Sequence, residues 1–516
     1  MMQRTLPLLI VPAMLIALAG CSSSLMNSTA NSSAAGTVPV SMSMTDDPPA
    51  GVSVLFFQVS LTNATLTPAS GSSSTSPVSL LSNNTPIQVD VTQLQALSAF
   101  LSTANVAPGT YNNLNLTFAD PQLVIFNQSD SSLGSTCAVG TICQLTPTFD
   151  NNSSTLSFTT SPFPVTVSAS SPLGFLIDFH LDTVIQSDLS VNLSVANGVT
   201  VAELPPAPQH PQFGFLTGTV GTVTASSNQF TVQTPWGRTF TIDTTSSTTF
   251  NNFPTSACTT AGIGCLAQGQ VVQIQISSVG TGGVLTASRV SYVQQATAQT
   301  VEGTIIKVIP STTTIAGAPP SGMDLILHWN PANNGSFPLG GEATVTFAGN
   351  ATYAIDNNGF TMPSGLTFTG ASNLTVGQNV TVTVEPGTLS NTGGGPGPSV
   401  WGPPPSVSFT ASNVELEPSQ VTGMITATDS SATSFTLGIG GGPFFAAWPM
   451  ASANAFSFNV MTTSQTSYTG FNPDSFSGLA TNDFVSANGW LFAPATSGGP
   501  PIIAAQSVVM RPSFWF

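Results

Sequence analysis

Short stretches in which hydrophobic and polar residues alternate recur along most of the chain. Clear examples span residues 52–61, 87–91 and 163–167, and turn residues bound the first of them on both sides. Alternation with a period of two residues is typical of β-strands that bury one face. Residues 94–101 differ, because their apolar positions have helical spacing, and we predict a helix there. The pattern as a whole predicts an all-β protein.

The strand pattern repeats three times after residue 213. Each copy opens with a strand of the form hydrophobic-x-Gly-x-hydrophobic, within residues 215–225, 301–309 and 421–427. Each copy then reaches a Thr- or Ser-rich segment with an aromatic residue near its end, and later a strand that follows a tight turn. The turn residue is glycine in two copies and Asn482 in the third. Five or six short strands per copy predict three small antiparallel domains of similar topology.

Composition agrees with this fold class. The chain has 516 residues, which at about 100–200 residues per domain predicts three or four domains. Hydrophobic residues make up 41%, enough to build cores and to argue against wholesale disorder. Only 5% of the residues are charged, against about 25% in an ordinary soluble domain. The helix formers Glu, Lys and Arg are scarce, while Val, Thr, Phe, Gly and Pro are abundant.

The balance of charge excludes some classes of partner. The formal net charge is −16. Beyond residue 20 the fixed positive charges are Arg238, Arg289, Lys307 and Arg511. Nucleic-acid binding depends on Lys and Arg that neutralise phosphates, so we expect no nucleic-acid partner. The same scarcity argues against electrostatic attraction to anionic lipids.

The beginning of the chain has the layout of a secretory signal. Arg4 precedes an apolar run over residues 6–18, and small residues lead to Cys21. At thirteen residues, the run is short for a membrane span, which needs about 20 apolar residues. An ordinary signal peptide with a chance cysteine and an uncleaved helix remain as alternatives.

The sequence Leu18-Ala-Gly-Cys21 resembles the lipobox of bacterial lipoproteins. The resemblance implies that Cys21 is the lipidated mature N-terminus, with palmitate-like acyl chains as the attachment to the membrane. Ser22 and Ser23, and no acidic residue, directly follow Cys21. In Gram-negative lipoproteins, the absence of an acidic residue at this place favours the outer membrane. We therefore expect an outer-membrane lipid anchor in the cell envelope, either surface-exposed or facing the periplasm.

Four further cysteines form two close pairs, Cys137 with Cys143 and Cys258 with Cys265. An exported protein folds in an oxidising compartment, so we predict two local disulfides. Zinc is the competing interpretation, but CxxC spacing and histidine partners are missing.

Residues 38–201 resemble a family of uncharacterised bacterial lipoprotein domains. The matching residues are a Thr-Asp-x-Pro type turn at 45–49, a Pro-Gly-x-Tyr segment at 108–111, and the strands at 59–66 and 175–179. The resemblance implies an antiparallel β-sandwich and no established activity. The three copies that follow resemble a second family of uncharacterised bacterial repeats, which implies small OB-like β-barrels.

These observations predict seven segments. In chain order they are a signal peptide (1–20), a flexible tether (21–37), a β-sandwich domain of unknown function (38–201), a Pro-rich linker (202–213), a first β-barrel repeat (214–295), a second repeat with inserted loops (300–418) and a divergent third repeat (419–516).

Two groups of residues are candidates for metal binding. Asp178, His180 and Asp182 alternate with apolar residues, so an extended strand would place all three on one face. Such a set could bind a divalent cation, although the polar outer face of a half-buried strand explains it as well. Asp46 and Asp47 could form an acidic calcium site, but a turn before proline explains them more simply.

Catalytic constellations are missing from the sequence. The three histidines are His180, His210 and His328, and His210 lies in the predicted linker. There is no GxSxG motif, and no glycosidase pair of carboxylates can be assigned. We therefore predict a protein that is not an enzyme and that needs no cofactor.

Five tryptophans near Pro- or Gly-rich loops are candidates for ligand binding, since exposed aromatic side chains stack on sugars and are enriched at interfaces. They are Trp236, Trp329, Trp401, Trp448 and Trp490. Packing in a core is the alternative for each. The sequence thus predicts a lipid-anchored structural or binding module. Its partner would be a glycan or another envelope protein. The alternatives are a carbohydrate- or matrix-binding adhesin and a hydrolase with an unrecognised site.

Overall fold

The structure is a computed structural model of the chain. It describes residues 38–47, 53–70, 76–81, 86–94, 99–127, 132, 137–138, 141–150, 153–168, 173–186, 188–204, 215–234, 238–254, 258, 260–280, 283–295, 299–311, 317–329, 337, 339–357, 359–391, 407–438, 457–494 and 499–510. Cys21, the tether, His210, Trp236, Trp401 and Trp448 lie outside these residues.

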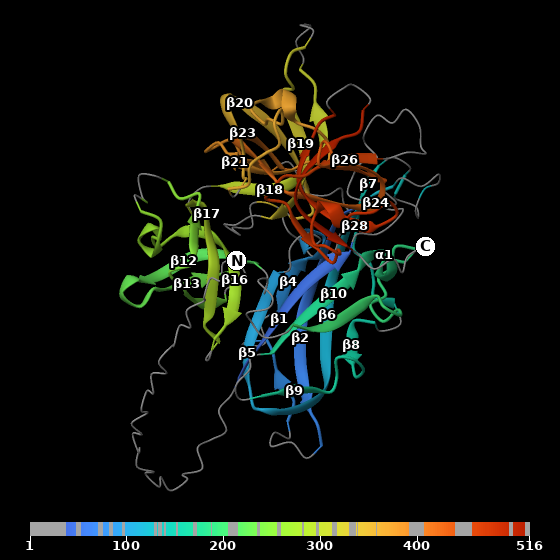
Figure 1. Cartoon of the computed structure of the whole chain (residues 1–516), viewed down its shortest axis with the longest axis vertical. Coiled ribbons are helices and arrows are strands. Elements are labelled where there is room, and N and C mark those ends of the chain that lie inside the picture. The colour runs from blue at the N-terminus through green and yellow to red at the C-terminus, as the bar shows by residue number, and fades with distance from the viewer. Residues whose placement is uncertain are drawn as a thin grey trace, which may run out of the picture. The chain divides into compact units, whose positions relative to one another are not determined.

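The N-terminal part is a β-sandwich, drawn in blue to green in Figure 1. In its first sheet the sandwich strands have the order β11-β10-β1-β5, and the sheet continues through one parallel pair, Ala99 with Phe215, into the first barrel. The strands are β1 (Val38–Asp47), β5 (Ala99–Val106), β10 (Leu173–His180) and β11 (Val199–Leu204). Neighbouring strands are antiparallel except β1 and β10, which run parallel.

The second sheet is built around two long antiparallel strands. They are β2 (Ser53–Pro68) and β6 (Gly109–Phe126). Five short strands flank them, namely β3 (Val78–Ser79), β4 (Ile87–Asp90), β7 (Ile142–Leu145), β8 (Thr155–Phe158) and β9 (Val165–Val167). The two sheets share one hydrophobic core, in which Phe118 of β6 meets Phe179 of β10 edge to face at 5.5 Å between ring centroids. The predicted sandwich is confirmed, but it is not wholly antiparallel as expected, because β1 and β10 run parallel.

The predicted helix at residues 94–101 is wrong. A short 3-10 helix, η2 (Val91–Leu94), ends where the predicted helix begins, and β5 starts at Ala99. Residues 95–98 are outside the described part. Phe100 and Leu101 are both buried, which suits a strand between two cores better than a one-sided helix. Pairing of β5 with β1 therefore overrides the helical spacing of the apolar residues.

Two strands extend further than the sequence predicted. β1 continues through Asp46 and Asp47, which pair with Phe179 and His180, so the predicted turn does not begin before Asp47. β11 continues to Leu204, which extends the sheet into the segment predicted as linker.

Three five-stranded barrels follow the sandwich. The first contains β12 (Phe215–Thr224), β13 (Gln229–Gln233), β14 (Thr239–Asp243), β16 (Gln270–Val279) and β17 (Leu285–Gln295). The second contains β18 (Thr300–Ile309), β19 (Gly322–Trp329), β20 (Glu342–Ile355), β21 (Asn379–Val384) and β23 (Val407–Glu417). The third contains β24 (Ser419–Asp429), β25 (Ser434–Gly438), β26 (Ser457–Met461), β28 (Phe484–Phe492) and β29 (Ile502–Met510).

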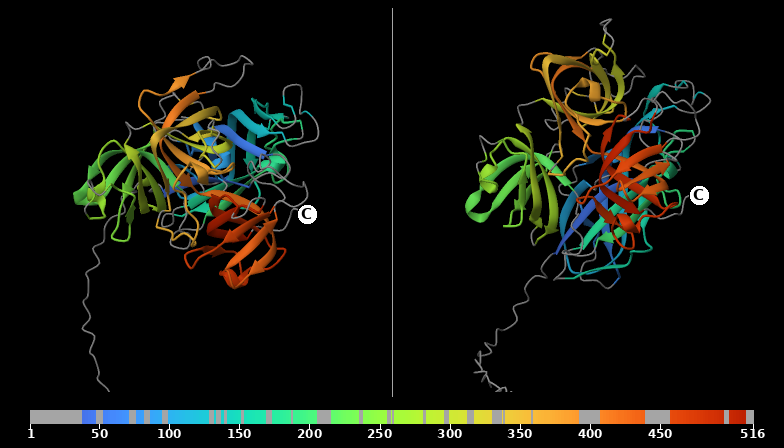
Figure 2. Two further views of the ribbon diagram at one scale, coloured as in Figure 1. Left: turned by 90° about the horizontal axis from the view of Figure 1, so that it is seen from above. Right: turned by 45° about the horizontal axis from the view of Figure 1, so that its top comes forward.

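The three barrels share one topology. Numbered within each barrel, the strands pair in the order 1-2-3-5-4-1, and the pair of strands 3 and 5 is parallel. Short strands accompany the barrels, namely β15 (Thr249–Asn251), β22 (Ser390–Asn391) and β27 (Ser467–Thr469). The yellow to orange strands of the second barrel wrap into a ring in the right-hand view of Figure 2. The prediction of three related OB-like barrels is confirmed.

The same turn introduces strand 4 of every barrel. A 3-10 helix precedes it, formed by η5 (Ile263–Cys265), η7 (Ala371–Asn373) and η9 (Phe476–Gly478). The turn residues Gly269, Gly377 and Asn482 have φ of +85°, +88° and +74°. Each turn amide donates a hydrogen bond of 2.8–2.9 Å to a carbonyl of the opening strand. Glycine and asparagine tolerate this left-handed conformation best, which explains why Asn482 can replace glycine.

The second and third barrels share part of a core. Trp490 of β28 is fully buried, and its ring lies 5.2 Å from that of Phe360 in the core of the second barrel. Its Nε1 donates a hydrogen bond of 3.1 Å to the Asp356 carbonyl oxygen. Among the described residues, no helix has the length and hydropathy needed to cross a membrane.

Candidate functional site

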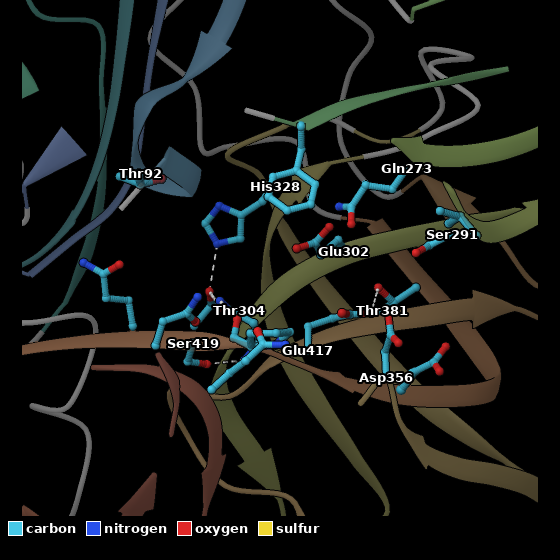
Figure 3. Close-up of a pocket in the computed structure, with 18 of the residues that line it drawn as sticks. Thr92, Gln273, Ser291, Glu302, Thr304, His328, Asp356, Thr381, Glu417 and Ser419 are labelled. Carbon is cyan, nitrogen blue, oxygen red and sulfur yellow. Dashed lines mark hydrogen bonds between the residues drawn. The ribbon is translucent and has the colours of Figure 1, made fainter. Parts of the chain in front are cut away.

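A cavity of about 410 Å³ is lined by residues of the sandwich and of all three barrels. Polar side chains dominate its lining, and several of them are labelled in Figure 3. The second barrel contributes its outer face, because its valines and leucines point inward to the barrel core. The alternation of β-strands therefore assigns the polar residues of β18, β21 and β23 to the cavity.

Two carboxyl groups lie in one row across this outer face. Glu302 of β18 pairs with Thr381 of β21, and Thr381 pairs with Glu415 of β23. Directly paired residues of an antiparallel sheet project on the same side. Glu302, Thr381 and Glu415 thus form a row that borders the cavity.

A second row lies two residues further along the same strands. Asn379 pairs with both Thr304 and Glu417. The Thr304 hydroxyl donates a hydrogen bond of 2.6 Å to Asn379 Oδ1, and the Thr381 hydroxyl donates one of 2.8 Å to Glu417 Oε1. The first bond lies within the second row, whereas the second connects the two rows and fixes the position of the Glu417 carboxylate.

Burial and mutual repulsion perturb the three glutamates. Burial, together with the charges of Asp90 and Asp356, raises the pKa of Glu302 to about 7, although His328 opposes the shift. Burial and the charge of Asp356 likewise raise the pKa of Glu415 to about 7. Burial is also the main cause that raises the pKa of Glu417 well above its ordinary value. Neutral pH therefore lies within the titration range of this face.

A buried histidine joins the second barrel to the sandwich. His328 of β19 is 4% exposed, and its Nδ1 lies 3.0 Å from Asp90 Oδ2 at the end of β4. Its Nε2 lies 2.8 Å from the Thr304 hydroxyl, the bond drawn in Figure 3. The chain of polar contacts runs from Asp90 through His328 and Thr304 to Asn379. It anchors one wall of the cavity.

The first barrel contributes a positive charge. Arg289 of β17 is half-buried, and its guanidinium lies 5.7 Å from the centre of the Phe215 ring. Burial lowers the pKa of Arg289, and the charge of Asp356 opposes that shift. Asp356 in turn accepts a hydrogen bond of 2.9 Å from Asn252 Nδ2. Four carboxyl groups at the cavity thus share one guanidinium.

The third barrel contributes an amide whose oxygen has no partner. Asn488 of β28 is 8% exposed and lines the cavity. Within the described part of the chain, its Oδ1 is buried and accepts no hydrogen bond. A buried acceptor without a donor costs about 1–3 kcal/mol, which a ligand with a hydrogen-bond donor could recover.

The cavity is bordered by the same outer face of each repeat, yet the acidic groups belong to the second. At the three positions of the Glu302–Thr381–Glu415 row, the corresponding residues are Thr217, Gln273 and Ser291 in the first repeat and Thr422, Ser486 and Val509 in the third. Carboxyl groups therefore replace neutral side chains in one copy only. The cavity is thus more acidic than the shared barrel fold requires.

The predicted metal candidates do not assemble. The strand β10 ends at His180, and Asp182 lies in the helical turn α1 (Leu181–Val184), so the alternation stops before it. His180 Nε2 lies 3.8 Å from Asp178 Oδ2. Among the described residues, no group of three His, Cys, Asp or Glu side chains is arranged to hold a metal ion.

Of the tryptophans predicted to bind a ligand, one is buried and the side chains of the others lie outside the described part of the chain. Trp490 is fully buried, so the prediction that it is exposed for ligand binding is wrong and the core alternative holds for it. Trp329 ends β19, and its side chain is outside the described part. The structure contains both predicted disulfides, Cys137–Cys143 and Cys258–Cys265.

Sequence reasoning missed the acidic face of the second barrel. Three of the six glutamates of the chain line the cavity, from strands more than 100 residues apart. The internal repeat contains one indication of this acidic face, because Glu302 occupies the position at which the other copies have Thr217 and Thr422. The grouping with Glu415 needed the strand order, which the sequence does not state.

Comparison with known proteins gives a family for the N-terminal part. No curated protein matches the chain. Residues 36–195 match the family model of a domain of unknown function, DUF4382. This match confirms an uncharacterised domain family for the segment that forms the sandwich.

Proposed function

We propose that this protein is a non-catalytic binding module of the cell envelope, and that the cavity between the sandwich and the barrels holds its ligand. The single observation that carries the proposal is the cavity of about 410 Å³ with its polar lining. Ligand pockets commonly have volumes of about 300–1,000 Å³ and a few convergent polar groups. Glu302, Glu415, Arg289 and Asn488 are such groups.

The cavity replaces the tryptophan row as the proposed binding surface. Trp490, the candidate whose side chain the structure describes, packs in a core. A polysaccharide-binding adhesin would need exposed aromatic platforms on which sugar rings stack. A small polar ligand needs only the cavity.

The test is a ligand screen that compares two variants of one strand. Gln273 of β16 lines the cavity, whereas Gln275, two residues further along the same face, does not line it. Gln273→Trp fills the cavity and Gln275→Trp adds the same side chain beside it. We expect compounds that raise the Tm of the full chain carrying Cys21→Ser to lose their effect in Gln273→Trp and to keep it in Gln275→Trp. Equal effects in both variants would place the ligand elsewhere.

We also propose that the protein is attached to the outer membrane through acyl chains on Cys21. The lipobox-like Leu18-Ala-Gly-Cys21 supports this proposal, as does the scarcity of Lys and Arg for electrostatic binding. Cys21→Ser should move the protein from the membrane fraction to the soluble envelope fraction. Retention of the variant in the membrane would contradict the anchor.

One observation favours a hydrolase as the second candidate. Glu302 and Glu415 share one face of a sheet, and the pKa of each is raised to about 7. A carboxyl group with such a pKa can donate a proton at neutral pH, as the general acid of a glycosidase does. Release of reducing ends from an envelope polysaccharide, lost in Glu415→Gln, would support this function over binding alone.

A further inference from the structure

We infer that the ligand of the cavity is a small organic cation, a protonated amine that also carries several hydroxyl groups. This inference rests on the proposed function and specifies the chemistry of the ligand. Amino sugars and other hydroxylated amines share this chemistry.

The charge of the cavity selects a cation. Glu302, Asp356, Glu415 and Glu417 line it, and Arg289 is the one fixed cation among its lining residues. With all four carboxyl groups ionised, the net charge of these groups is −3. Like charges held together in a partly buried site repel one another, and this repulsion adds to burial in raising the pKa of Glu415 and Glu417. A bound cation relieves it.

The unpartnered oxygen of Asn488 indicates a ligand that donates hydrogen bonds. Asn488 is more than nine-tenths buried, comes from a different barrel and has no charge. Its free acceptor is therefore independent of the acidic residues. An ammonium group donates three hydrogen bonds and accepts none, which matches a lining of carboxylate and amide oxygens.

Hydroxyl and amide groups of the lining match the rest of such a ligand. Gln273 and Ser291 of the first barrel and Ser419 and Gln420 of the third border the same cavity. Hydroxyl and amide groups both donate and accept hydrogen bonds, as sugar and polyol hydroxyls do. A hydroxylated amine thus finds partners over its whole length.

The spacing of the acids favours an organic cation over a metal ion. Glu302 and Glu415 lie on strands separated by β21, which puts their backbones about 10 Å apart. Ligands of a single Ca²⁺ ion lie at about 2.3–2.6 Å from it. A ligand several bonds long can contact both glutamates, with Thr381 between them.

The test compares two nearly isosteric probes by calorimetry on the full chain carrying Cys21→Ser. Glucamine, 1-amino-1-deoxy-D-glucitol, has an aliphatic amine where sorbitol has a hydroxyl. An aliphatic amine of the lysine type has a pKa of about 10.4, so glucamine stays charged over the range of the test. We expect glucamine to bind with an affinity about tenfold or more above that of sorbitol at about pH 7.5.

Acidification provides a second readout. Protonation of the glutamates removes the negative charge that holds the amine, so glucamine affinity should fall about tenfold or more between about pH 7.5 and pH 5.5. The titratable and charged groups that face the site from the packed elements are Asp90, Arg289, Tyr292, Glu302, His328, Asp356, Glu415 and Glu417.

Variants test whether the carboxyl groups of the acidic row cause the preference for glucamine. Glu302→Gln with Glu415→Gln should abolish the preference for glucamine over sorbitol. The control Glu203→Gln, on an exposed position of β11, removes a glutamate charge from a residue that does not line the cavity and should leave the preference unchanged. The comparison of the two probes on the unchanged cavity needs no variant, so the inference stays testable if the double variant fails to fold.

Three outcomes would overturn the inference. Equal binding of sorbitol and glucamine, displaced in Gln273→Trp, would refute the cationic ligand and keep the proposed function. Binding of CaCl₂ in place of glucamine would assign the site to a metal ion. Binding of neither probe, with no compound distinguishing Gln273→Trp from Gln275→Trp, would refute both the inference and the proposed function.

Discussion

At the scale of single residues, the cavity concentrates carboxyl groups in a chain that has few charges. Glu302 and Glu415 lie on the outer face of a barrel and yet are half-buried, because the sandwich and the other barrels pack around them. Such groups destabilise the fold when they ionise, since burial disfavours the charged form. Their presence is costly for stability, which supports a role in binding.

This cost predicts how stability responds to pH. Because the pKa of folded Glu415 is raised to about 7 from 4.5, its ionisation destabilises the fold progressively as the pH rises from about 4.5 to about 7. Glu415→Gln should therefore stabilise the protein by about 1–2 kcal/mol at about pH 8 and have little effect at about pH 4.5. Thermal unfolding at both pH values checks this. A variant that is less stable at pH 8 would contradict the assigned burial.

At the scale of elements, the repeat preserves one turn whose backbone is left-handed. The residue before strand 4 has positive φ in all three barrels, and its amide bonds to the opening strand. The turn fixes the register of strand 4, which contributes Gln273, Thr381 and Asn488 to the cavity. An error in this register would move those side chains to the other face of the sheet.

The turn gives a matched pair of substitutions. A Cβ at Gly269 would meet no atom within 4 Å, so Gly269→Ala tests backbone strain alone. We expect it to destabilise the first barrel by about 1 kcal/mol. Asn482→Gly should be neutral or slightly stabilising, because glycine adopts positive φ without strain. Chemical unfolding of both variants provides the measurement, and a larger loss in Asn482→Gly would refute the argument.

At the scale of the molecule, the barrels depend on one another. Trp490 belongs to the third barrel by sequence and to the core of the second by packing. Its indole also bonds to the Asp356 carbonyl, which lies beside the acidic row. The position of Asp356 at the cavity is thus supported from a different repeat.

This dependence predicts coupled loss of structure. Trp490→Ala should destabilise the protein by about 3–5 kcal/mol and increase hydrogen exchange in β21 as well as in β28. Phe435→Ala removes a buried ring within the third barrel's own core and should increase exchange in that barrel only. Exchange measured by mass spectrometry distinguishes the two. Unchanged protection of β21 in Trp490→Ala would contradict the shared core.

The sequence pattern predicted most of the elements because the alternation that marks a strand can be recognised from residues close together in the chain. Alternation identified β2, β4 and the repeated barrel strands, and the replacement of glycine by Asn482 followed from the repeat alone. The helix predicted at residues 94–101 failed because spacing in a short apolar run does not distinguish a helix from a strand buried on both faces. The alternation through Asp182 failed because a pattern does not mark where a strand ends.

By itself, the sequence determined the all-β class, the threefold repeat, the cysteine pairing and the scarcity of cations, since these depend on composition and on residues close together in the chain. Only the tertiary structure decided that Glu302, Glu415 and Asn488 border one cavity, and that Trp490 is buried. The reason is that neighbouring strands in a barrel are set by hydrogen-bond pairing between distant segments. The packing of one barrel's outer face against other domains leaves no periodic trace in the sequence.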